Sequence, residues 1–149
     1  MKAEFADRLV KHINFLEEEL KDHTQFKDFN RDDYLKNRDK RRNIERWIEN
    51  IINSTVDISR VILSIEEKPL PDTYREIVLM ISAVEGLEGL DTEKLSKWVK
   101  FRNIIAHEYL DIKWNSISKF IAEVEALYRD FTAIIKEYSK HKFESEKVR

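Results

Sequence analysis

Residues 44–71, IERWIENIINSTVDISRVILSIEEKPLP, predict a long helix with a stripe of mostly apolar residues. Its stripe positions recur at steps of three and four residues, the spacing that gathers side chains on one face of an α-helix. The helix must end where Pro69 and Pro71 occur, because proline cannot continue it. We predict a helix of about 34 residues at 1.5 Å per residue, longer than its neighbours can cover. Its overhang, or the apolar face left beside residues 101–109, is a candidate dimer surface. The stripe positions are Ile44, Ile48, Ile51, Thr55, Ile58, Ile62 and Ile65.

Two further helices are predicted on either side of this segment. The first carries apolar residues from Phe5 to Leu20 at helical spacing, and a polar loop near residues 22–31 follows it. The next begins at Asp72 or Thr73, because Thr73 and Glu76 form a capping-box pattern, and it ends before the glycines at positions 86 and 89.

The last two predicted helices follow those glycines. Asp91 has the side chain and position of a helix cap for the fourth. The fifth follows Asn115 or Ser116 and fades into a charged tail, residues 140–149, which we expect to be frayed. Short connections favour antiparallel neighbours, so we predict an all-α, up-and-down bundle of four main helices plus one shorter helix.

Composition supports one helical domain over residues 1–149. Hydrophobic residues make up 42% of the chain and charged residues 38%, with only two Gly and two Pro, which suits long helices with solvated faces. The chain has no cysteine, which excludes a disulfide framework, a thiolate zinc site and a cysteine nucleophile. The first eight residues lack the apolar core of a signal peptide, and no run of about 18 apolar residues occurs. We expect a soluble, cytoplasmic protein with no membrane contact.

The net charge of −2 argues against a generally basic nucleic-acid-binding surface. Two local clusters of cations nevertheless occur in the sequence. Each can be interpreted as a binding path for RNA or as a solvated helix face. One is the run from Lys36 to Arg42, and the other recurs at near-helical spacing as Lys94, Lys97, Lys100 and Arg102.

Residues 101–109, FRNIIAHEY, contain an arginine, a histidine and a tyrosine in the pattern R-x4-H-x-Y. Arg102 occupies a position on the helical stripe that periodicity assigns to a core residue. An arginine binds phosphate with its planar fork, a histidine transfers protons near neutral pH, and a tyrosine hydroxyl donates or accepts hydrogen bonds. The combination of Arg102, His107 and Tyr109 therefore favours a site that handles phosphodiesters, in which Asn103 orients the phosphate or the histidine. The stripe is Leu95, Val99, Arg102, Ala106 and Tyr109.

Each motif residue also has a structural interpretation. Arg102 can pair with Asp57 or Glu108, His107 can cap the end of its helix, and Tyr109 can be a core aromatic residue. Asp57 either orients Arg102 or is simply solvated. Because His107 lies roughly 140° round a regular helix from Arg102, the two meet at one atom only if the helix loosens or if a two-fold dimer brings them together in trans.

The chain resembles the HepT-type toxin branch of the HEPN superfamily in the order of three features: Val56-Asp57-Ile58, then Pro71-Asp72-Thr73-Tyr74-Arg75-Glu76, then the motif with Asp111 and Ile112 behind it. The resemblance implies a small all-helical homodimer that acts as a metal-independent RNase toxin and uses no cofactor. It implies Arg102 and His107 as catalytic residues, supported by Asn103, Tyr109 and Asp57. It also implies a minimal nucleotidyltransferase antitoxin as partner, which modifies Tyr109.

Another class of function stays open beside this one. The protein can instead be a non-catalytic helical subunit that binds a nucleotide or regulates a nucleotidyltransferase, with the motif as a binding and modification site. A metal site is not expected, because the other histidines have no second ligand at a suitable spacing. These are His12, His23 and His141.

Overall fold

The computed structural model describes residues 2–147, and within this range every regular element is a helix. Four helices are long and four are short. The long ones are α1 (Lys2–Lys21), α4 (Arg38–Ile65), α6 (Thr92–His107) and α7 (Leu110–Lys147). The short ones are α2 (His23–Phe26), α3 (Arg31–Lys36), α5 (Tyr74–Met80) and the 3-10 helix η1 (Ile81–Ala83).

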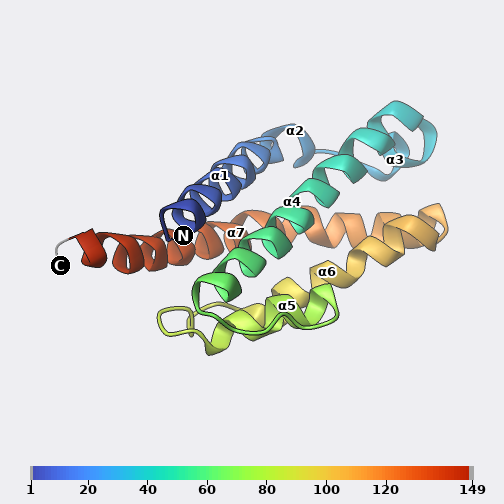
Figure 1. The fold of residues 1–149 in the computed structure, drawn as a ribbon. Coiled ribbons are helices and arrows are strands. Elements are labelled where there is room, and N and C mark those ends of the chain that lie inside the picture. The colour runs from blue at the N-terminus through green and yellow to red at the C-terminus, as the bar shows by residue number, and fades with distance from the viewer. Residues whose placement is uncertain (1, 148–149) are drawn as a thin grey trace.

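The long helices alternate in direction along the chain (Figure 1). Helix α1 packs on α4 and α7, α6 packs on the same two helices, and α5 lies against α4 and α6. This arrangement confirms the predicted all-α class with four long helices, but the described residues contain four short helices where one was predicted. The dimer stays a prediction. In the part of the chain that the structure describes, no helix is both long and apolar enough to cross a membrane.

The core joins α6 to the rest of the bundle through aromatic rings. Phe120 of α7 is fully buried and lies 5.1 Å from the ring of Trp98 and 5.8 Å from that of Trp47, measured between centroids. The indole N–H of Trp98 also donates to Glu123 Oε2 at 3.1 Å. Edge-to-face contacts of this kind stabilise the fold beyond the burial of apolar surface, so they hold the part of α6 around Trp98 against α7 and α4.

Two predicted helix starts are confirmed by their caps. Thr73 Oγ1 accepts a hydrogen bond from the Glu76 N–H at 3.2 Å, and Asp91 Oδ1 accepts one from the Lys94 N–H at 3.1 Å. Each cap satisfies a backbone donor that has no partner within its own helix. The starts of α5 and α6 are therefore set by local sequence.

The long second helix is shorter than predicted. It has 28 residues, because Asn37 accepts from the Lys40 N–H at 3.1 Å and starts a new helix there. The predicted loop at residues 22–31 is also partly wrong, since it contains α2 and leads directly into α3, whose cap is Asn30. Asparagine side chains compete with the helix backbone for hydrogen bonds, so these two residues divide the segment.

The predicted start of the last helix is wrong. Helix α7 begins at Leu110, and Asn115 and Ser116 lie inside it. Its first turns are held by distant residues: Trp114 lies 5.8 Å from the ring of Tyr34, and Asp111 Oδ1 lies 2.6 Å from Arg31 Nη2. These tertiary contacts outweigh the preference of Asn and Ser for a cap position. The charged tail is helical as far as Lys147, and residues 148–149 of it lie outside the described residues.

Candidate functional site

The motif lies at the C-terminal end of α6, where the helix leaves the core. Leu95 and Val99 are buried, Arg102 is half-buried, and Ala106 is exposed. Helix α5, which packs against α6, has seven residues against sixteen in α6, so it covers only part of this face. The prediction of an apolar stripe through the motif therefore holds for the first half of α6 and fails for the second.

The guanidinium of Arg102 lies over an aromatic ring that the motif does not contain. Its Cζ atom is 5.1 Å from the centroid of Tyr74, and the Cζ atom of Arg60 is 4.9 Å from the same centroid. The two guanidinium groups, that of Arg60 first, lower the pKa of the Tyr74 phenol, because positive charge favours the phenolate. Arg60, Tyr74 and Arg102 come from α4, α5 and α6 respectively, so the bundle brings together groups that are far apart in sequence.

A hollow of about 410 Å³ opens beside Arg102 between α5 and α6. Asn103 and Ala106 line it, with Glu49 of α4 at one side. A second hollow of about 350 Å³ shares Arg75 and Lys100 with the first and continues along α6. Together they are lined by two carboxylates, Glu49 and Glu93, and by five cations: Arg75, Lys94, Lys97, Lys100 and Arg102.

These five cations form no ion pair with a described carboxylate. Cations on other helices do: Lys136 Nζ lies 2.6 Å from Glu17 Oε1, and Arg129 Nη2 lies 2.7 Å from Glu125 Oε1. Of the two predicted cation clusters, the one on α6 has no such pair, whereas in the other Lys36 lies 3.8 Å from Asp32 and Lys40 lies 3.2 Å from Asp33. An unneutralised cluster along a hollow attracts polyanions more strongly than paired surface cations do.

His107 and Tyr109 lie apart from this hollow. His107 is exposed, is the last residue of α6, and makes no hydrogen bond or ion pair with any described residue. The helix is regular up to this point, because the Glu108 N–H donates to the Ile104 carbonyl at 3.0 Å. The expected alternative in which α6 loosens near His107 is therefore wrong, and neither His107 nor Tyr109 lines the hollow that holds Arg102.

Tyr109 lies between α6 and α7 with 84% of its surface exposed, so its interpretation as a core residue is wrong. Its carbonyl accepts from the Lys113 N–H at 3.0 Å and so opens α7. Asp57 Oδ1 lies 3.8 Å from Arg60 Nη1, so it contacts the second arginine of the Tyr74 pair instead of Arg102.

Sequence reasoning did not assign a role to Arg60 or Tyr74. Tyr74 is the first residue of α5 and lies within the segment of residues 71–76, and Arg60 lies on α4 outside its predicted stripe. Nothing in their spacing links them to Arg102, because the contact depends on how three helices pack.

The comparison with protein families agrees with this architecture. A family model described as "Ribonuclease HepT-like" matches residues 16–146, a range that includes α4, α5, α6 and the motif. No curated protein matches the sequence. On the family match, which covers most of the chain, the protein belongs to the HepT-like ribonuclease family.

Proposed function

We propose that the protein is a toxin that cleaves RNA in the cytoplasm without a metal, using Arg102 and His107. The observation that carries the proposal is the position of Arg102 in a hollow lined by unpaired cations, with the rest of the motif at the same end of α6. Family membership supports RNA as the substrate. A single strand of RNA exposes its phosphates and 2′-hydroxyls to such a surface.

The chemistry needs one proton carrier and one group that stabilises charge. The 2′-oxygen attacks the adjacent phosphorus and the bond to the 5′-oxygen breaks, which leaves a cyclic phosphate. His107 accepts the 2′-hydroxyl proton and, once protonated, supplies a proton to the leaving 5′-oxygen. Arg102 stabilises the charge that develops on the phosphate oxygens, and Asn103, which lines the same hollow, orients the phosphate.

The regular helix makes a dimer part of this proposal. Five residues separate Arg102 from His107, which on a regular helix means roughly 140° of rotation and about 7.5 Å of rise. The hollow of one chain therefore contains Arg102 without His107. A two-fold dimer completes the site when the partner's His107 reaches this hollow, and the symmetry creates two equivalent composite sites.

Regulation by a minimal nucleotidyltransferase antitoxin fits the exposure of Tyr109. A transferase must reach the phenol oxygen from solvent, and Tyr109 is the most exposed large hydrophobic residue among the described residues, at 84%. A nucleotidyl group on Tyr109 adds bulk and negative charge beside His107, which repels the RNA phosphates. Modification at this position is therefore expected to stop cleavage.

The test is RNA cleavage by purified protein in the presence of a metal chelator. We expect the wild type to cleave, and Arg102→Ala and His107→Ala each to lose on the order of 10²–10⁴-fold in rate, as for loss of a positioned proton carrier. His12→Ala, a histidine of α1 away from the motif, is the matched control and keeps full activity. Inactive wild type that binds a nucleotide would instead support a non-catalytic partner subunit.

A further inference from the structure

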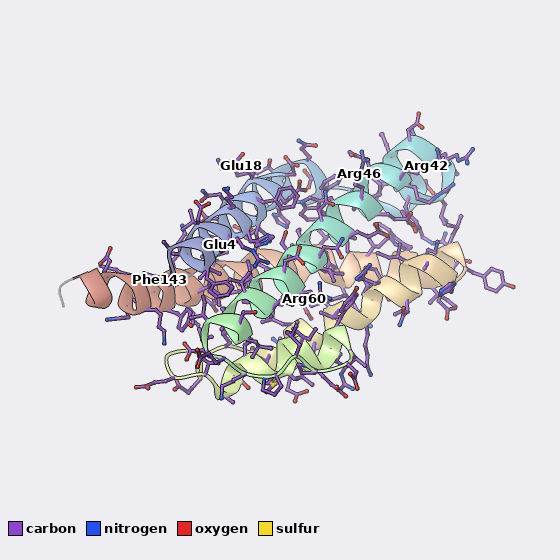
Figure 2. All side chains as sticks on the ribbon, in the orientation of Figure 1. Glu4, Glu18, Arg42, Arg46, Arg60 and Phe143 are labelled. Carbon is purple, nitrogen blue, oxygen red and sulfur yellow. The ribbon has the colours of Figure 1, made fainter. Side chains whose placement is uncertain are left out.

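Two arginines share one exposed tyrosine at the edge of the Arg102 hollow. Arg60 lies on α4 next to α5 (Figure 2), and its guanidinium and that of Arg102 are each about 5 Å from the Tyr74 centroid. We propose that Arg60, Tyr74 and Arg102 form a clamp for a backbone phosphate of the bound RNA. The inference rests on the proposed function for its ligand and adds Arg60 and Tyr74 to the binding machinery.

The first argument is charge. With distances of 4.9 Å and 5.1 Å to one centroid, the two Cζ atoms are at most 10.0 Å apart. Among the described residues, the carboxylate that forms an ion pair with either arginine is that of Asp57, and its contact with Arg60 is long, at 3.8 Å, and about 40% exposed on both sides. Arg60 and Arg102 together with the weakly held Asp57 carboxylate retain a net positive charge. A phosphate bound by both arginines would neutralise this charge.

The second argument is geometry and access. The aromatic face of Tyr74 attracts both guanidiniums and so holds them in place before a ligand arrives. The ring is 43% exposed and lines the hollow together with Arg102, so a phosphate can enter from solvent without displacing a core residue. The lowered pKa of the Tyr74 phenol is consistent with both cations lying near its hydroxyl. A planar guanidinium can donate hydrogen bonds to two phosphate oxygens at once, which suits arginine to this role.

A simpler interpretation is that Tyr74 and Arg60 only hold Arg102 in position. The two interpretations differ in salt dependence. Each phosphate contact with a single strand contributes about 0.7 to the slope of log K against log salt concentration. An arginine that binds phosphate therefore changes this slope when its charge is removed, and an arginine with a structural role does not.

The experiment measures binding of a labelled single-stranded RNA by fluorescence anisotropy at several salt concentrations. Methyl groups on the 2′-oxygens of this RNA prevent cleavage. We expect Arg60→Gln to bind more weakly with a slope reduced by about 0.7. Arg60→Lys keeps the charge and the slope but loses the planar fork, so only its affinity falls. The matched control is Arg129→Gln, which removes an exposed arginine paired with Glu125 on α7 and should change neither quantity.

An Arg60→Gln protein with the slope and affinity of Arg129→Gln would overturn the clamp. Thermal melting of each variant shows whether it is folded, and Arg60→Lys gives a second comparison if Arg60→Gln is not. Failure of the clamp is separable from failure of the proposed function. Wild type that cleaves RNA while Arg60→Gln keeps the normal slope refutes the clamp alone. Wild type that binds with the predicted slopes and never cleaves refutes the ribonuclease and leaves the clamp intact, whereas no RNA binding refutes the clamp.

Discussion

Mixed dimers test whether Arg102 and His107, the two proposed catalytic groups, act across subunits. Helix α6 is regular through His107, so the side chain of His107 points roughly 140° away from that of Arg102 in the same chain. If each site takes Arg102 from one chain and His107 from the other, a dimer of one Arg102→Ala chain and one His107→Ala chain has one intact site and one doubly defective site. We therefore expect about half of the wild-type activity per dimer, given two independent sites.

The reciprocal pairing gives the opposite result. One chain carries both substitutions and its partner is wild type, so that each composite site lacks one group and we expect almost no activity. If Arg102 and His107 acted within one chain, this second dimer would keep half of the activity and the first would have none. The assay is cleavage of a fluorophore-quencher RNA by dimers purified through two different affinity tags.

Both pairings are needed, because low activity in one alone can reflect poor assembly. An inactive first dimer together with a half-active second dimer would refute the trans site. A wild-type protein that stays monomeric by light scattering while cleaving RNA at full rate would refute it as well. High and equal activity in both pairings would show that cleavage needs Arg102 and His107 together neither within one chain nor across two, which contradicts the assignment of His107 as proton carrier.

Three further results are expected. Phe120→Ala should lower the free energy of unfolding by about 3–5 kcal/mol in urea titrations, because it leaves a cavity among the core rings, whereas Phe15→Ala at a 47% exposed site should cost roughly 0.5 kcal/mol or less. Tyr138 donates to Glu66 Oε1 at 2.5 Å, and burial followed by this carboxylate raises its pKa, so the folded pKa lies above the unfolded one. The stabilisation that this raised pKa gives the folded state is complete below the ordinary tyrosine pKa of about 10 and is lost as pH rises through the folded pKa. Tyr138→Phe lacks this titrating group, so in thermal melts it should lose less stability than wild type between about pH 8 and pH 11. A minimal nucleotidyltransferase with labelled nucleotide should label the wild type and leave Tyr109→Phe unlabelled; label of equal intensity in the variant would contradict the assignment of Tyr109.

The parts of the fold that follow from local rules were predictable from the sequence. The stripe of α4 becomes the buried face of that helix, and the caps at Thr73 and Asp91 form as their side chains require. The start of α7 was not predictable in this way. Asn115 and Ser116 have the residue types of a cap, but contacts with residues about 80 positions earlier, including Arg31 with Asp111, extend the helix past them.

In the candidate site, too, the features that follow from local spacing were predictable and those that depend on packing were not. The angle between Arg102 and His107 could be calculated from their spacing on a regular helix. The structure meets that assumption, because α6 is regular as far as His107. Exposure did not follow from spacing, because periodicity assigned Tyr109 to a stripe that is buried only in its first half. The contact of Arg102 with Tyr74, and of Tyr74 with Arg60, required the packing of three helices, so no pattern in one segment predicted it.

Net charge was the weakest guide to function, and the reason lies in how the ion pairs are distributed. A chain with a formal charge of −2 has no overall electrostatic attraction for a polyanion. Some cations and carboxylates, however, neutralise each other locally, as Lys21 does with Glu18 on α1 and Lys142 does with Glu66. The cations along the α5–α6 hollows have no such partners among the described residues. Since screening limits the field of an exposed charge to roughly 10 Å at moderate salt, an RNA strand in these hollows interacts with the local excess of positive charge far more than with the total.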